Sequence, residues 1–140
     1  SLAGLRLGYL LGDPSLIRPV LEKTRDSYNV DAISQAIGLA AIEDQTYAQK
    51  TWACVRRDRK ILAAGLTALG FSVAASQTNF VLAQTPKNVS AFQVYQALKD
   101  KGILVRYFNT PRLQDALRIT VGTPEQNHLL LDQLDQLIGD

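Results

Sequence analysis

A nearly continuous apolar run at residues 5–11, bounded by Gly4 and Gly12, constrains the fold of this chain most strongly. Runs of this length and composition are typical of a β-strand that is covered on both faces, as in a parallel sheet. Such a strand needs neighbouring strands, because unpaired backbone groups in a buried position are costly. Few other segments of this chain can supply them, so we expect its partner strands to come from elsewhere.

Arg6 makes the same stretch a candidate anion-binding site. It lies between Gly4 and Gly8, and glycine allows a backbone to bend or to approach a ligand closely because it lacks a Cβ atom. The guanidinium group carries a rigid set of donors that suits a phosphate or a carboxylate. The residues alone leave a second interpretation open, in which Arg6 pairs with a carboxylate on the surface.

The rest of the chain alternates predicted helices and strands, which is typical of an α/β fold. Asp13 and Pro14 predict a helix start, and Thr123 and Pro124 repeat that signal, with Gln126 completing a capping box. A third helix, over residues 45–69, ends at Gly70, and others are expected from Ala32 and after Ser90. The expected strands are residues 71–75, 79–84, 103–106 and 116–122, of which the first two form an antiparallel hairpin.

Arg118 is the second candidate anion-binding residue. In the last predicted strand Leu117, Ile119 and Val121 share one face, while Arg118 and Thr120 share the other. An arginine opposite the apolar face, close to a turn that contains glycine, is a candidate for bidentate binding of a carboxylate. The alternative is an arginine on a solvated sheet face.

Composition and charge narrow the possible functions. A chain of 140 residues can bury one core, and a net charge of +2 is too small to indicate binding to nucleic acid or to an anionic membrane. The basic cluster at residues 56–60 has no interleaved aromatic residues, so we interpret it as a solvated helix face. No apolar run approaches the roughly 20 residues that span a bilayer.

The single cysteine and the single histidine give no catalytic or metal-binding pattern. Cys54 has no second cysteine for an intramolecular disulfide, which fits a reducing compartment. It lies in the middle of a predicted helix with no histidine nearby, so we interpret it as an inert structural thiol. His128 has no histidine, cysteine or acidic partner at ligand spacing, which favours a surface histidine over a metal ligand.

Several segments, in the same order along the chain, resemble the class I/II (fold type I) aminotransferases that use pyridoxal phosphate. Leu-Ala-Gly-Leu-Arg-Leu-Gly-Tyr at positions 2–9 is similar to the segment after the family's cofactor-binding lysine. Leu-Arg-Ile-Thr-Val-Gly-Thr at positions 117–123 is similar to its substrate-anion strand. Further similarities lie at residues 28–30, 78–82 and 101–106. The branch that the chain resembles most is histidinol-phosphate aminotransferase, although Ser27 stands where that branch often has proline.

The resemblance implies the C-terminal portion of such an enzyme. Residues 1–43 would complete the large cofactor-binding domain, with the boundary at a shift in composition near residue 43. Residues 44–140 would form a small C-terminal α/β domain, with a three- to four-stranded, mainly antiparallel sheet covered by helices. Because the chain contains no methionine, we expect it to be part of a longer protein.

The resemblance also implies a cofactor and roles for two residues. Arg6 would hold the phosphate of pyridoxal 5'-phosphate, and Arg118 would bind the carboxylate of a small amino-acid or oxo-acid substrate. The cofactor-binding lysine would lie upstream of Ser1, so we predict that these 140 residues alone contain no catalytic residue and are inactive. The implied whole protein is a cytoplasmic homodimer of histidine biosynthesis, which transfers an amino group between histidinol phosphate and 2-oxoglutarate or glutamate.

The residues leave one alternative of another class. The chain would then be a non-catalytic α/β module that binds a small anion or a partner protein. A Ser-Lys pair upstream in the same gene would favour the aminotransferase over this module.

Overall fold

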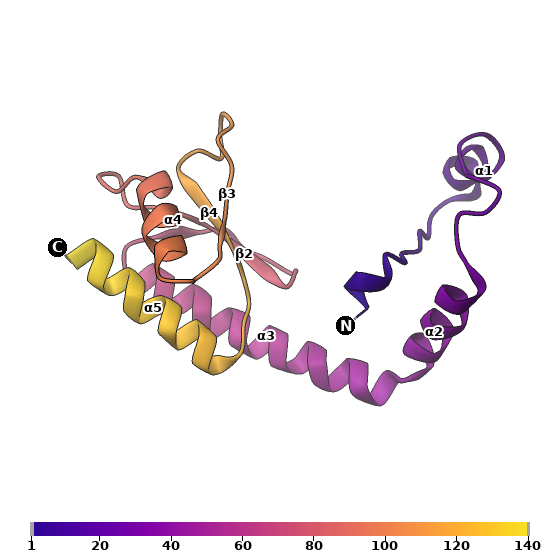
Figure 1. Cartoon of the computed structure of the whole chain (residues 1–140), viewed down its shortest axis with the longest axis horizontal. Coiled ribbons are helices and arrows are strands. Elements are labelled where there is room, and N and C mark those ends of the chain that lie inside the picture. The colour runs from indigo at the N-terminus through magenta and orange to yellow at the C-terminus, as the bar shows by residue number, and fades with distance from the viewer. Residues whose placement is uncertain (1, 140) are drawn as a thin grey trace. The chain divides into compact units, whose positions relative to one another are not determined.

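The computed structural model describes residues 2–139. These residues form two compact units, and the boundary between them along the chain lies between Gln49 and Lys50. We call residues 2–49 the N-terminal unit and residues 50–139 the C-terminal unit. The long helix α3, Gln45–Ala68, belongs to both (Figure 1). None of the helices within the described residues combines the length and the apolar character needed to cross a membrane.

The N-terminal unit contains a short 3-10 helix, η1 (Ala3–Leu5), followed by the α-helices α1 (Pro14–Lys23) and α2 (Ala32–Glu43). Both α-helices begin where the sequence predicts, because an aspartate caps each of them. The Asp13 carboxylate accepts a hydrogen bond from the backbone N–H of Ser15, and Asp31 does the same for Ser34, each at 2.8 Å.

The predicted buried strand at residues 5–11 is wrong for this structure. Among its described residues the N-terminal unit has no strand, and Leu10 and Leu11 are 67% and 84% exposed. The physical reason is that a strand needs a partner for its backbone groups, and no described segment pairs with this one. Leu7 packs closely against Gly38 of α2, where a Cβ atom would collide with the Leu7 side chain.

The C-terminal unit contains a four-stranded antiparallel sheet in the order β1-β2-β4-β3. The strands are β1 (Ser72–Val73), β2 (Phe80–Gln84), β3 (Arg106–Tyr107) and β4 (Ala116–Thr120). The predicted α/β class, the mainly antiparallel sheet and the hairpin formed by β1 and β2 are confirmed. The strand expected at residues 103–106 is wrong in extent, because Ile103 donates its N–H to the carbonyl of Leu98 at the end of the preceding helix. The chain therefore joins the sheet only at Arg106.

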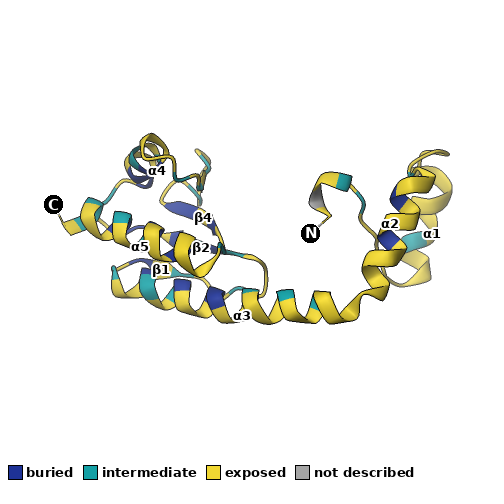
Figure 2. Cartoon of the chain, turned by 60° about the horizontal axis from the view of Figure 1, so that its bottom comes forward, coloured by how far each residue is buried: buried dark blue, intermediate teal, exposed yellow. Residues whose placement is uncertain are grey.

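Within the described residues of the C-terminal unit, three helices cover one face of this sheet and none covers the other, which we call the open face. They are α3, α4 (Ala91–Asp100) and α5 (Pro124–Gly139). The buried residues of the unit gather between these helices and the sheet (Figure 2). Alternate residues of the two central strands, Val81, Ala83, Leu117 and Ile119, face this core and are at most 1% exposed.

Helix ends in the C-terminal unit follow local sequence signals. Gly70 and Gly102 have φ angles of +85° and +76°, which a residue with a side chain rarely adopts. Each glycine stands just after a helix and donates its N–H back into the last turn, as in a Schellman motif. At the start of α5, Thr123 and Gln126 exchange the two hydrogen bonds of the predicted capping box.

Candidate anion-binding site

Arg118 lies in β4 on the open face of the sheet. Its neighbours Leu117 and Ile119 are buried at 0% and 1% exposure, whereas Arg118 and Thr120 are exposed. The alternation predicted from the sequence is therefore present. The guanidinium group faces away from the core, so it is available to a ligand without disturbing the packing beneath it.

Arg106 lies directly opposite Arg118 in the β3–β4 ladder. Cross-strand partners share one face of a sheet, and like charges placed opposite each other destabilise it. Within residues 2–139 neither guanidinium group has an ion-pair or hydrogen-bond partner. Two unpaired cations on one face make an arrangement suited to an anion with two negative charges. Arg106 is not among the site residues predicted from the sequence, because only the strand register places it beside Arg118.

Two aromatic rings accompany these arginines. The guanidinium carbon of Arg106 lies 5.2 Å from the centre of the Phe108 ring, and that of Arg118 lies 5.6 Å from the same centre. Arg118 is also 5.3 Å from the centre of the Phe80 ring. These distances are within the range of cation–π attraction. Both rings were absent from the sequence-based site, and no pattern in the sequence indicates their role.

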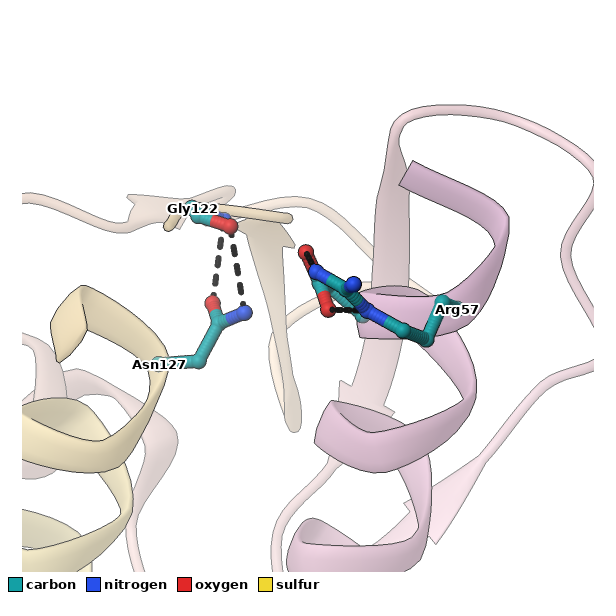
Figure 3. A network of polar contacts seen from close by, with 4 residues as sticks. Arg57, Gly122 and Asn127 are labelled. Carbon is teal, nitrogen blue, oxygen red and sulfur yellow. Dashed lines mark hydrogen bonds and ion pairs between the residues drawn. The ribbon is translucent and has the colours of Figure 1, made fainter. Parts of the chain in front are cut away.

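Hydrogen bonds fix both ends of β4. Beyond its C-terminal end, the buried Asn127 side chain accepts a hydrogen bond from the Gly122 N–H at 2.9 Å and donates one to the Gly122 carbonyl at 3.2 Å (Figure 3). Just before its N-terminal end, the carbonyl of Asp115 accepts a hydrogen bond from the Thr85 N–H at 2.9 Å. The strand that carries Arg118 is thus tied to α5 and to the end of β2.

The interpretation of residues 56–60 as a solvated helix face is wrong for Arg59. This side chain is only 9% exposed and donates a hydrogen bond to the carbonyl of Thr78, in the loop that leads into β2. The arginine of α3 thereby holds the segment that precedes Phe80. Beside it, Arg57 hydrogen-bonds to Asp58 at 2.7 Å (Figure 3), which lowers the pKa of the Asp58 carboxyl below its usual value.

Arg6 belongs to the N-terminal unit and is exposed. Its φ angle of 59° lies in the left-handed region, where residues other than glycine are uncommon and where ligand-binding residues are over-represented. The side chain makes no ion pair or hydrogen bond with the part of the chain that the structure describes. An unpaired guanidinium group has the donors that a phosphate requires, so the chemistry of this residue fits a cofactor phosphate.

No metal-binding cluster occurs among residues 2–139, where no three histidine, cysteine or acidic side chains gather in a way that could hold an ion. His128 nevertheless has an acidic neighbour that the sequence analysis overlooked. Its Nε2 lies 3.4 Å from a carboxylate oxygen of Asp132, one helical turn further along α5. Cys54 forms no disulfide and is exposed on α3, so the interpretation of it as a structural thiol is wrong.

Comparison with known families identifies the class of protein. Residues 1–134 match the family described as aminotransferase class I and II. The chain belongs to this family.

Similar proteins narrow the comparison to one branch of the family. The chain is 51% identical to histidinol-phosphate aminotransferase 1 of Nostoc sp. (strain PCC 7120), over 99% of this chain and 38% of that protein. It is 46% identical to histidinol-phosphate aminotransferase of Synechocystis sp. (strain PCC 6803), over 99% of this chain and 39% of that protein. The chain thus spans about two fifths of the length of these relatives, and the part it matches is their C-terminal part.

Solved structures agree in fold. The crystal structure of histidinol-phosphate aminotransferase from Sinorhizobium meliloti in complex with pyridoxal-5'-phosphate matches with a TM-score of 0.79 at 26% identity, over 99% of this chain and 38% of that one. The enzyme of the same name from Clostridium acetobutylicum matches with a TM-score of 0.86 at 21% identity, over 99% and 42% of the two chains. The second likeness, at its low identity, concerns the fold alone.

Proposed function

We propose that this chain is the C-terminal part of a pyridoxal-phosphate-dependent aminotransferase that transfers an amino group between histidinol phosphate and 2-oxoglutarate or glutamate. The observation that carries the proposal is the pair of opposed, unpaired arginines, Arg106 and Arg118, on the open face of the sheet. The names of relatives that are 51% and 46% identical support the choice of substrate.

The chemistry of the two arginines suits both proposed substrates. A phosphate monoester and a dicarboxylate each carry two negative charges, and guanidinium groups bind such oxygens with pairs of hydrogen bonds. In this proposal Arg118 binds a carboxylate or phosphate oxygen, and Arg106 supplies the second positive charge. Together they orient the substrate, which lowers the barrier because the reacting atoms are held in place.

Arg6 would hold the phosphate of pyridoxal phosphate, which is the second part of the proposal. Its unpaired side chain and left-handed backbone support this role. The cofactor, when bound, supplies the electron sink for amino transfer. This chain's contribution to that step is a fixed positive charge at the phosphate.

The domain assignment and the assembly complete the proposal. Residues 1–43 complete the large domain, and residues 44–140 form the small one. Several large apolar side chains of the N-terminal unit are exposed, including Leu11 at 84% and Ile33 at 71%. Apolar surface of this kind is typical of protein interfaces, which supports packing against the rest of a large domain and a second subunit in a homodimer. A cytoplasmic location is drawn from the family resemblance.

The test is substrate discrimination by the full-length protein. We expect amino transfer from histidinol phosphate to 2-oxoglutarate, and a large loss of kcat/KM when unphosphorylated histidinol replaces histidinol phosphate. Arg106→Gln should remove much of this difference, because one of the two charges facing the phosphate is lost. Equal use of histidinol and histidinol phosphate by the wild-type protein would contradict the proposed substrate.

The non-catalytic anion-binding module is the second candidate. The observation in its favour is that Arg106 and Arg118 both belong to the C-terminal unit, so their anion site requires no other part of a longer protein. A Ser-Lys pair upstream in the same gene, together with transaminase activity of the full-length product, would exclude this candidate.

A further inference from the structure

We propose that Phe108 is the positioning residue of the anion-binding site, holding the guanidinium groups of Arg106 and Arg118 together against their mutual repulsion. This inference rests on the proposed function of the arginine pair. The Phe108 ring contacts no reacting group. Its role would be to keep the two guanidinium groups at positions from which both can bind one dianion.

The need for such a residue follows from the pair itself. Arg106 and Arg118 are exposed, carry the same charge and stand opposite each other in the ladder. An exposed arginine has several rotatable bonds, so repulsion favours conformations in which the two heads point apart. A site that must be assembled from separated heads binds its anion more weakly than one already in place.

The structure contains a group that opposes this separation. The centre of the Phe108 ring lies 5.2 Å from the guanidinium carbon of Arg106 and 5.6 Å from that of Arg118. The negative face of an aromatic ring attracts cations within about 6 Å. One ring therefore attracts both arginines, and Phe80, at 5.3 Å, attracts Arg118 in addition.

Phe108 is well placed to act as a fixed point. It directly follows β3, where Arg106 lies on the open face and Tyr107 packs against the core. The Tyr107 ring lies 5.5 Å from that of Phe92 and 5.9 Å from that of Tyr95, both on α4. Since Tyr107 is anchored in this aromatic cluster and Phe108 is half-buried beside it, the ring that both arginines approach is held by the strand end next to it.

The experiment measures phosphate binding by the 140-residue chain. Inorganic phosphate is titrated at constant ionic strength while the Nε–H signals of Arg106 and Arg118 are followed by NMR, with chloride as the anion for comparison. Phe108→Leu keeps an apolar side chain but removes the ring, whereas Phe108→Tyr and Phe108→Trp keep a ring. Trp52→Leu is the control, because Trp52 is a half-exposed ring on α3 that lies outside this aromatic cluster and, among the described residues, is in cation–π contact with neither arginine. Denaturant midpoints on the same samples report whether each variant folds.

We expect Phe108→Leu to weaken phosphate binding about five- to tenfold and to shift the Nε–H signals of both arginines together. Phe108→Tyr and Phe108→Trp should restore the affinity, and Trp52→Leu should leave it unchanged. If Phe108 had a purely structural role, the phosphate affinity of each variant would instead fall in proportion to its loss of stability. The tyrosine and tryptophan substitutions would then not restore the affinity.

Three outcomes would overturn the inference. Phosphate affinity of Phe108→Leu within twofold of the wild type would show that the ring does not position the pair. Equal weakening by Phe108→Leu and Phe108→Trp would show that only the shape of phenylalanine matters. In the third outcome, the wild-type chain binds phosphate no better than chloride, and Arg118→Lys leaves the phosphate affinity unchanged. The proposed anion-binding site would then be wrong as well. This outcome separates failure of the proposed function from failure of the positioning role alone.

Discussion

Asn127 and Gly122 exchange two hydrogen bonds across the turn between β4 and α5, at 2.9 Å and 3.2 Å. The side chain thereby replaces the β-sheet partner that the Gly122 backbone lacks, and it does so from a position that is only 5% exposed. This contact fixes the end of the strand that carries Arg118. It is therefore the point at which fold stability and the geometry of the anion-binding site are most directly connected.

Replacing Asn127 by alanine should destabilise the C-terminal unit. The substitution leaves the N–H and the carbonyl of Gly122 without a partner in a partly buried position, and we expect a loss of about 2 kcal/mol in the free energy of unfolding. Urea denaturation followed by circular dichroism gives the measurement. Asn88→Ala, at an exposed asparagine, is the control and should change stability by no more than about 0.5 kcal/mol. Equal effects of the two substitutions would contradict the structural role of Asn127.

Gly65 should not tolerate a larger residue. A Cβ atom at this position of α3 would lie 2.5 Å from Cδ1 of Leu131 on α5, so the two helices approach each other closely here. Gly65→Val should destabilise the chain by about 1–3 kcal/mol through overpacking. Combining it with Leu131→Ala should recover part of this loss, which a double-mutant cycle measures. Strict additivity of the two substitutions would mean that the residues do not interact.

In the full-length protein, Arg118→Lys should damage turnover more than folding. Lysine keeps the charge but loses the paired hydrogen bonds, which should cost on the order of 2–3 kcal/mol in transition-state binding, or roughly a hundredfold in kcat/KM. Stability should change by at most about 0.5 kcal/mol, since Arg118 is outside the core. Steady-state kinetics with glutamate and denaturant midpoints test both parts, with Arg56→Lys, at an exposed arginine of α3, as the control. Retained activity with a collapse of stability would identify Arg118 as a structural residue.

The 140-residue chain alone should show no transaminase activity. The family resemblance places the cofactor-binding lysine before Ser1, so none of the lysines present is expected to bond to the cofactor. Incubation with pyridoxal phosphate and reduction with borohydride should give only scattered labelling of exposed amines, detected by peptide mass spectrometry. Stoichiometric labelling of one lysine would refute the prediction.

Backbone amides at residues 7–10 should exchange rapidly with solvent in the isolated chain. This segment is in no helix or strand and, in the structure described, pairs with no strand, so its N–H groups lack the protection that a sheet provides. Hydrogen exchange measured by NMR or mass spectrometry gives the rates, and residues 117–119 of β4 serve as the protected reference. Slow exchange at residues 7–10 in a demonstrated monomer would mean that the segment finds partners within the chain.

The sequence by itself determined the features that depend on short-range chemistry. Asp13 begins a helix because its carboxylate satisfies an N–H two residues away, and Gly70 ends one because only glycine adopts its positive φ at low cost. The faces of β4 follow from the two-residue period of a strand, so the exposure of Arg118 could be predicted from its neighbours alone.

Tertiary structure decided the features that depend on which distant segment of the chain packs against a given residue. The apolar run at residues 5–11 has the pattern of a buried strand, yet no described segment pairs with it, because a strand is defined by its partners. Arg59 lies in a segment whose composition is typical of a solvated helix face. Its side chain nevertheless hydrogen-bonds to a carbonyl 19 residues away and is buried there. Arg106 becomes a partner of Arg118 only through the register of β3 on β4, and register is a long-range property that no single segment encodes.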